Sequence, residues 1–233
     1  MKIIGAIGLC LVGACASGPA QPIPGGESIL RRVDDSLRVL GDYTVDLDIT
    51  ADLEGISIPP ARVRMSFKYP DRTRFESEGF ALVPREALDL TPGRILDHFT
   101  VVDVARDTLG NDRAYRLLLR GVPQRTRFPV AEIVVHAGRW TIDQLTASMS
   151  GGRTIDARFV NAPVEGHWLP HRLTIVFSDP SPGQPETPPS PLQKPDAGLQ
   201  VRTTGGGTVS VLYGTYRLHA GLPDSLFTPS PRP

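Results

Sequence analysis

Residues 43–53 read YTVDLDITADL and residues 61–69 read ARVRMSFKY. In both stretches an apolar side chain occupies every second position, and charged or hydroxyl-bearing side chains occupy the positions between. Successive side chains of a β-strand point to opposite faces of the sheet. The period of two therefore predicts two long strands, each with one buried face and one face in water.

The segments on either side of these strands extend the pattern. A turn at Pro70–Asp71 and a further strand over residues 72–80 predict an antiparallel meander. Before residue 43 the spacing becomes helical, with apolar residues at Ile29, Val33, Leu37 and Leu40. This stripe predicts a helix over residues 27–40 that ends at Gly41.

The remainder of the chain is mostly strand-like. Two short helices are expected over residues 84–90 and 91–99, the second with Thr91 as its cap and Pro92 at its first position. Further strands are expected over residues 101–109, 113–121, 130–137, 141–149, 154–160, 168–178, 199–203 and 209–218. The fold class is therefore mostly β, with one antiparallel sheet of about ten strands.

A sheet of this length is expected to curl, and the helices would then cover part of its apolar concave face. A ligand is one candidate for the remainder of that face. Strands and helices do not alternate, which argues against a doubly wound nucleotide-binding fold.

The net charge indicates which kinds of partner to expect, and the positions of the cysteines indicate whether disulfides can form in the fold. The formal net charge is +0, so no basic surface is expected that would attract nucleic acid. The chain has 2 cysteines, Cys10 and Cys15, and both lie at the N-terminus. Disulfides are therefore not expected to contribute to the fold.

The N-terminus itself has the pattern of an export signal. Lys2 is followed by an apolar run over residues 3–14, which is too short to span a bilayer and suits a signal-peptide core. Residues 12–15, VGAC, resemble a bacterial lipobox, which implies cleavage before Cys15 and attachment of lipid to that cysteine. An ordinary secretory signal with a chance cysteine is the alternative.

This interpretation divides the chain into four parts. Residues 1–14 are expected to be a lipoprotein signal peptide, residues 15–26 a flexible tether and residues 27–228 the folded domain. The domain includes a proline-rich loop at residues 180–198, and residues 229–233 are expected to be a disordered tail.

Few residues have a pattern that suggests catalysis. His167 and His171 are four residues apart, but Pro170 and the strand pattern argue against a helical metal pair. The sequence has no Cys/His cluster, no nucleophile elbow and no phosphate-binding loop. No catalytic residue, metal or cofactor is therefore assigned, and the chain is not expected to be an enzyme.

The charged residues of the first strands are expected to lie on a solvated face. This applies to the acidic side chains of Asp46, Asp48 and Asp52. Four arginines, which are expected to pair with carboxylates such as Glu76 and Glu78, follow on the next strands: Arg62, Arg64, Arg72 and Arg74. Binding of a lipid phosphate or of a partner's acidic patch is the alternative role for some of these arginines.

Several segments together resemble a known family. They are the helix-then-strand opening (Ser28–Leu30 to Tyr43–Asp46), FKYPDRTRF at residues 67–75, GHWLP at residues 166–170 and YRLHAGLPDSLF at residues 216–227. Their order and spacing resemble the LolA/LolB family of periplasmic lipoprotein carriers. The wider superfamily also contains RseB-type sensors and mycobacterial lipid-binding lipoproteins. His219 stands where Asn is common in the family, and the insertion at residues 180–198 is unusual.

The resemblance implies an open half-barrel in which helices cover a concave apolar face that takes up acyl chains. Six residues on one side of the sheet are the expected lining of this trough: Val45, Leu47, Ile49, Val63, Met65 and Phe67. The alternative is that these side chains form a plain core against the first helix.

The resemblance also implies a function and a location. We expect a monomer that binds acyl chains of lipoproteins or lipids, is anchored to a membrane through Cys15 and meets a periplasmic carrier protein. Ala16 after the cysteine, rather than Asp, indicates the outer membrane, facing the periplasm. The alternative is an envelope sensor or scaffold that binds a protein partner through the same fold.

Overall fold

The computed structural model describes residues 22–77, 88, 90–149, 152–178 and 206–228. Its helices are α1 (Gly26–Leu40), α3 (Pro92–His98) and the 3-10 helix η1 (Asp224–Phe227). Its strands are β1 (Asp42–Leu53), β2 (Ile56–Ser57), β3 (Ala61–Lys68), β4 (Arg72–Ser77), β5 (Phe99–Leu109), β6 (Asp112–Gly121), β7 (Val130–His136), β8 (Ile142–Ser148), β9 (Thr154–Val164), β10 (His167–Ser178) and β11 (Gly207–Leu218).

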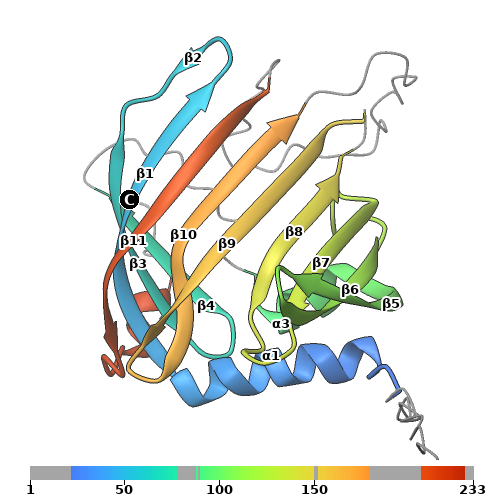
Figure 1. The fold of residues 1–233 in the computed structure, drawn as a ribbon. Helices are drawn as coiled ribbons and strands as arrows, with labels where there is room; N and C mark the ends of the chain where they lie inside the picture. Colours follow the sequence, from blue (N-terminus) through green and yellow to red (C-terminus); the bar gives the residue numbers. More distant parts are fainter. Residues whose placement is uncertain (1–21, 78–87, 89, 150–151, 179–205, 229–233) are drawn as a thin grey trace, which may run out of the picture.

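The described strands form one 11-stranded sheet in the order β4-β3-β1-β11-β10-β9-β8-β7-β6-β5, and β2, off this path, pairs with β1. Every pairing is antiparallel. β4 and β5 lie at opposite ends of this order, so the sheet curls without closing (Figure 1). The predicted fold class, a mostly β, open and curved antiparallel sheet with few helices, is confirmed.

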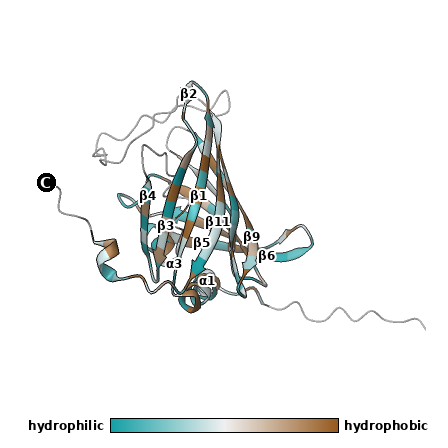
Figure 2. Ribbon diagram, turned by 90° about the vertical axis from the view of Figure 1, so that its left-hand side faces the viewer, coloured by the Kyte–Doolittle hydropathy of each residue, from teal (hydrophilic) through white to brown (hydrophobic). Residues whose placement is uncertain are grey.

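The strands that decided the prediction pair in the register that the alternation requires. Val45 lies opposite Met65 and Leu47 opposite Val63, so the apolar side chains of β1 and β3 share one face. Apart from the half-buried Ala51 and Ala61 these apolar side chains are buried, whereas the residues between them are half-buried or exposed, with Ser66 the one buried exception on these two strands. Figure 2 shows the resulting alternation of hydrophobic and hydrophilic residues along the strands.

The helix α1 lies across one end of the curved sheet, beneath the ends of the strands (Figures 1 and 2). Its stripe buries Ile29, Leu30 and Val33. The helix ends at Gly41, whose positive φ of 71° is a backbone conformation that glycine adopts without a steric penalty. The Gly41 amide donates a hydrogen bond to the Leu37 carbonyl. The predicted helix is therefore confirmed.

The helix α3 also begins as predicted. Thr91 is the cap, its Oγ1 accepts a hydrogen bond from the Arg94 amide at 3.4 Å, and Pro92 occupies the first turn. Phe99, which was expected to close the helix, instead begins β5. The other expected short helix, apart from Leu88 and Leu90, lies outside the described residues, as do the strand at 199–203 and the loop at 180–198.

The buried side chains form two clusters. The first cluster gathers the inner faces of β1, β3, β10 and β11, with Leu47, Val63 and Leu173 at its centre. The second cluster joins two helices, α3 and the first half of α1, to the strands β6 and β7. Leu30 and Leu117 lie at its centre. Since Leu40 belongs to the first cluster, α1 spans both.

Candidate functional site

A cavity of about 120 Å³ lies between α1 and the concave face of the sheet. α1, β1, β3, β8, β9, β10, β11 and the segment before α3 all contribute to its wall. The lining residues are Val33, Ser36, Leu37, Tyr43, Met65, Phe67, Leu88, Leu90, Thr91, Trp140, Thr141, Ile142, Phe159, Asn161, Trp168, Leu169, Pro170 and Tyr213. Val33 belongs to the second cluster and Met65 to the first, so the cavity lies where the two clusters meet.

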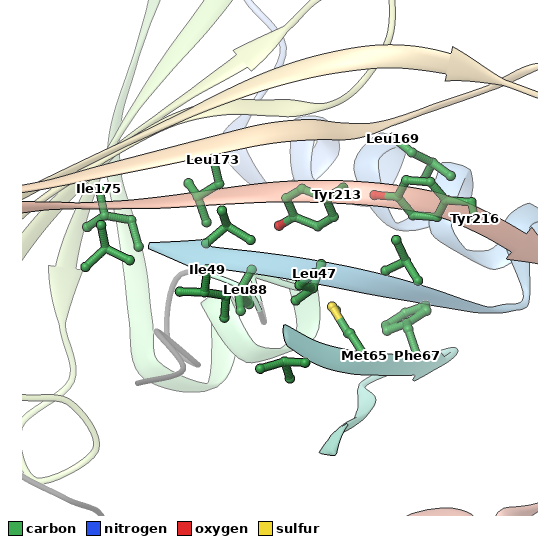
Figure 3. Close-up of a cluster of buried hydrophobic side chains, with 14 of the residues drawn as sticks. Leu47, Ile49, Met65, Phe67, Leu88, Leu169, Leu173, Ile175, Tyr213 and Tyr216 are labelled. Atoms are coloured by element: carbon green, nitrogen blue, oxygen red, sulfur yellow. The ribbon is translucent and has the colours of Figure 1, made fainter. Parts of the chain in front are cut away.

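Aromatic rings form one side of this cavity. The rings of Tyr43 and Phe67 stack with centroids 5.2 Å apart, and Tyr43 meets Tyr216 edge-on at 5.4 Å. Tyr213 and Tyr216 lie nearly parallel at 6.2 Å. Figure 3 shows these two tyrosines beside each other on β11, with Met65 and Phe67 on β3.

Two tryptophans also line the cavity, and an arginine guanidinium stacks on the ring of each. The Arg32 guanidinium lies 4.7 Å from the centre of the Trp140 ring, and the Arg139 guanidinium lies 4.6 Å from that of Trp168. None of the described lining side chains carries a formal charge at neutral pH. Both arginines therefore contact rings that line the cavity without belonging to the lining themselves, and the lining is neutral.

The polar side chains of Thr141 and Asn161, which line the cavity, form hydrogen bonds with a neighbouring carboxylate. Asp143 Oδ1 accepts hydrogen bonds from Thr141 Oγ1 at 2.6 Å and from Asn161 Nδ2 at 2.8 Å. The preceding turn is held by His136, whose Nδ1 accepts from the amides of Gly138 and Arg139. These bonds hold the β7–β8 turn, and with it Trp140, at the cavity edge.

The size of the cavity limits what it accommodates as it stands. An engineered apolar cavity of about 150 Å³ stays dry and takes up benzene. A space of about 120 Å³ is therefore suited to a short piece of hydrocarbon. α1 and Leu88 pack over part of the concave face, and this partly open cavity remains between them and the sheet.

The structure separates the six residues that were expected to line the trough. Met65 and Phe67 line the cavity. The other four, Val45, Leu47, Ile49 and Val63, are 0–3% exposed and form the core around it. Cys15, the expected lipid attachment site, lies outside the described residues.

Tyr213 is a lining residue that sequence reasoning did not identify. Between the pairs Val45–Tyr216 and Leu47–Tyr213, β11 has two residues where β1 has only Asp46, which makes a β-bulge. The bulge turns Tyr213 and Tyr216 to the same face although they are three residues apart. The available signal was Gly214, since a glycine inside a strand often marks a bulge or a close backbone approach. A Cβ at residue 214 would lie 3.0 Å from the Asp46 carbonyl oxygen.

The outer face of the same strands is charged and paired. Arg62 Nε lies 3.0 Å from Asp48 Oδ1, and Arg64 Nε lies 2.9 Å from Asp46 Oδ1. The prediction that the arginines pair with carboxylates is confirmed. The expected partners were wrong for Arg62 and Arg64, because β3 lies beside β1 and its arginines meet the aspartates of that strand.

The two remaining arginines lie on β4. Arg74 pairs with Glu76 of its own strand at 2.9 Å. Arg72 Nη1 lies 2.8 Å from Asp224 Oδ1, which also accepts a hydrogen bond from Lys68 at 2.7 Å. These contacts hold η1 against the β4 edge of the sheet.

The histidines of β10 are not arranged as a metal site. His167 lies beside His219, with ring centroids 6.2 Å apart. Within the described ranges no group of three or more His, Cys, Asp or Glu side chains is placed to hold a metal ion. Among those residues no helix has the length and apolar character needed to cross a bilayer.

A second hollow lies outside the concave face. It is an open groove of about 850 Å³ along β5 and the start of α1, bordered by Gly26, Leu96 and Val102 among others. Leu96 and Val102 are exposed there. Among the described strands β5 pairs with β6 alone, so this groove follows an open edge of the described sheet.

The sequence matches no protein-family model and no curated protein. Solved structures do share the fold. A LolA superfamily protein from Nitrosomonas europaea superposes with a TM-score of 0.57 at 14% identity, over 89% of this chain and 99% of the other.

Two further solved structures are similar to the same extent. A domain from Vibrio parahaemolyticus described as an outer membrane lipoprotein-sorting protein gives a TM-score of 0.56 at 10% identity, over 87% of this chain and 95% of the other. A DUF1329 family protein from Desulfovibrio piger gives 0.57 at 13% identity, over 87% and 95%. The expected LolA-like fold is confirmed by these likenesses.

Proposed function

We propose that this chain binds an acyl chain of a lipoprotein or lipid in the cavity beneath α1 and acts in lipoprotein localisation or lipid transfer. The observation that carries the proposal is a partly open, uncharged cavity between a helix and the apolar concave face of the sheet. The fold is shared with a protein described as lipoprotein-sorting, which supports the same proposal.

The energetics favour hydrocarbon over a polar ligand. Each buried methylene contributes about 0.8 kcal/mol, and the contribution needs no directed chemistry. A cavity of this size takes only part of a long chain, so we propose that uptake of the remainder displaces α1. Val33, Ser36 and Leu37 of α1 form the helical wall of the cavity, and their movement would enlarge it directly.

Intrinsic fluorescence offers a direct test, because the chain has 2 tryptophans and both line the cavity. The purified chain is stripped of lipid and titrated with a bromine-substituted palmitoyl methyl ester, since bromine quenches nearby indoles. We expect saturable quenching of Trp140 and Trp168. Lipid extracted from the untreated protein and analysed by mass spectrometry should contain acyl chains.

A matched pair of variants locates the ligand. Leu37→Phe adds volume to the cavity wall and should weaken the quenching titration. Leu212→Phe adds the same volume on the outer face, where Leu212 is 43% exposed, and should leave the titration unchanged. Absence of quenching and of extractable lipid would contradict the proposal and favour the sensor or scaffold alternative. Turnover of an ester substrate would instead indicate a hydrolase.

The anchor belongs to the same proposal. Acylation of Cys15 places the cavity at a membrane surface, and we propose the outer membrane, facing the periplasm. Cells fed radiolabelled palmitate should label the chain, and Cys15→Ser should abolish both the label and the recovery of the chain with membranes. A labelled Cys15→Ser chain would contradict the assignment.

A further inference from the structure

Two tyrosines on β11 share a face but differ in what their hydroxyl groups contact. The Tyr216 hydroxyl donates a hydrogen bond to the Pro170 carbonyl at 2.7 Å. The Tyr213 hydroxyl makes no hydrogen bond with any residue in the described ranges, although the Tyr213 side chain lines the cavity and is only 6% exposed. One buried phenol is therefore satisfied by the protein and the other is not.

The surroundings of Tyr213 explain why this difference matters. Its neighbours include Leu47, opposite it on β1, and Leu88 and Met65 in the same cluster. Burial raises the pKa of the Tyr213 phenol well above its usual value, so the hydroxyl stays protonated and remains a donor. The hydroxyl oxygen is not among the fully buried polar atoms that lack a partner, so it keeps access to the cavity that Tyr213 lines. Its donor is therefore available to an acceptor that enters the cavity.

We propose that the Tyr213 hydroxyl donates a hydrogen bond to the neutral carbonyl oxygen of the bound acyl group, an ester or an amide. This inference rests on the function proposed above and narrows it from hydrocarbon in general to acyl compounds. No described lining side chain is cationic, so an ionised fatty acid would bring an unpaired charge into the cavity. The site therefore selects esters and amides over free carboxylates.

The test compares ligands of similar chain length that differ in their head group. Methyl decanoate and N-methyldecanamide carry a neutral carbonyl, decanoate carries a charge, and dodecane carries no acceptor. Each displaces the brominated ester from the wild-type chain, followed through Trp140 and Trp168. We expect decanoate to bind more weakly than its methyl ester. We expect the hydrogen bond to appear in the ratios of ester and of amide affinity to dodecane affinity, which should fall when the Tyr213 hydroxyl is removed. Comparing the ester with the amide separates a phospholipid source from the N-acyl group of a lipoprotein.

Two variants assign the effect to Tyr213. Tyr213→Phe should weaken ester and amide binding about tenfold, as expected for one hydrogen bond in an apolar site, and leave dodecane binding unchanged. Tyr216→Phe removes a hydroxyl whose hydrogen bond already goes to the Pro170 carbonyl, so this variant should not alter the ratio of ester to dodecane affinity. Thermal unfolding of each variant checks that it is folded.

Other outcomes overturn the inference in distinguishable ways. Equal losses for the ester and for dodecane in Tyr213→Phe would mean that the ring shapes the cavity and the hydroxyl contacts no carbonyl. Unchanged ester affinity would mean that water satisfies the hydroxyl. Failure of every ligand to displace the brominated ester, or of that ester to bind, would instead refute the proposed function itself.

Discussion

The two faces of β1 and β3 are built from alternate residues of the same stretches and do different work. On the inner face, Leu47 and Val63 lie opposite each other and are fully buried. On the outer face, the next pair along, Asp48 and Arg62, form an ion pair whose side chains are 58% and 77% exposed. Burial of apolar area stabilises the fold, whereas exposed ion pairs contribute little. The comparison shows that the interior carries both the stability and the cavity.

The largest effect is expected from truncating the inner face. Leu47→Ala should lower the free energy of unfolding by about 2–5 kcal/mol, because a fully buried leucine leaves a void that its neighbours fill only in part. Thr50→Ala, on the exposed face of the same strand, should change it by less than about 0.5 kcal/mol. Urea denaturation measures both. Similar losses in the two variants would remove the distinction between the faces.

A smaller effect separates the two inner tyrosines. Tyr216→Phe leaves the Pro170 carbonyl without its donor and should lower the free energy of unfolding by about 1–3 kcal/mol. Tyr213→Phe removes an unpaired hydroxyl and should leave the ligand-free protein equally stable or more stable. Urea denaturation of the lipid-free chains measures the difference. A loss in Tyr213→Phe as large as in Tyr216→Phe would show that the Tyr213 hydroxyl already has a partner.

Adding a single methyl group at the bulge that turns both tyrosines inward should lower the stability of the folded protein. Gly214→Ala brings a Cβ to 3.0 Å from the Asp46 carbonyl oxygen and should lower the free energy of unfolding by about 1 kcal/mol. Gly93→Ala, in α3, meets nothing within 4 Å and should raise it by up to about 1 kcal/mol through helix propensity. Thermal unfolding compares the two. A stabilised Gly214→Ala chain would mean that β1 and β11 separate without strain.

Substituting a charged residue on the outer face should change the free energy of unfolding least. The hydrogen bond from Arg64 holds the pKa of the Asp46 carboxyl below its usual value. A carboxyl with a lowered pKa in the folded state adds stability above its unfolded pKa of about 3.9, and this stability is lost as the pH falls through the folded pKa.

Asp46→Asn should therefore lower the free energy of unfolding at pH 7 by less than about 1 kcal/mol. Its difference from wild type should vanish near about pH 2 and shrink in high salt. Urea denaturation across pH measures it. A difference that persists in acid would assign the effect of the substitution to packing and not to charge.

Much of the architecture follows from local periodicity. The alternation at residues 43–53 and 61–69 predicts two strands and both of their faces, and the spacing of Ile29, Val33 and Leu37 predicts α1 with its buried stripe. Thr91 with Pro92 predicts the start of α3. These signals work because a strand or helix repeats its geometry along the chain, so neighbouring residues alone report it.

The candidate site depended on contacts between distant segments. The cavity joins side chains from α1, six strands of the sheet, the segment before α3 and the β7–β8 turn, and its volume is what their packing leaves unfilled. Of the six residues expected to line it, Met65 and Phe67 do so, and Leu47 does not, because alternation identifies a face but not which part of that face a helix covers.

The sequence by itself therefore determined which side chains of each strand face inward and where the first helix lies. The tertiary structure alone decided where the concave face stays unfilled and that a bulge at Gly214 presents Tyr213 to that space. The physical reason is that strand register and packing volume depend on residues such as Leu47 and Tyr213. These two residues meet only when the first and last strands along the chain, β1 and β11, pair.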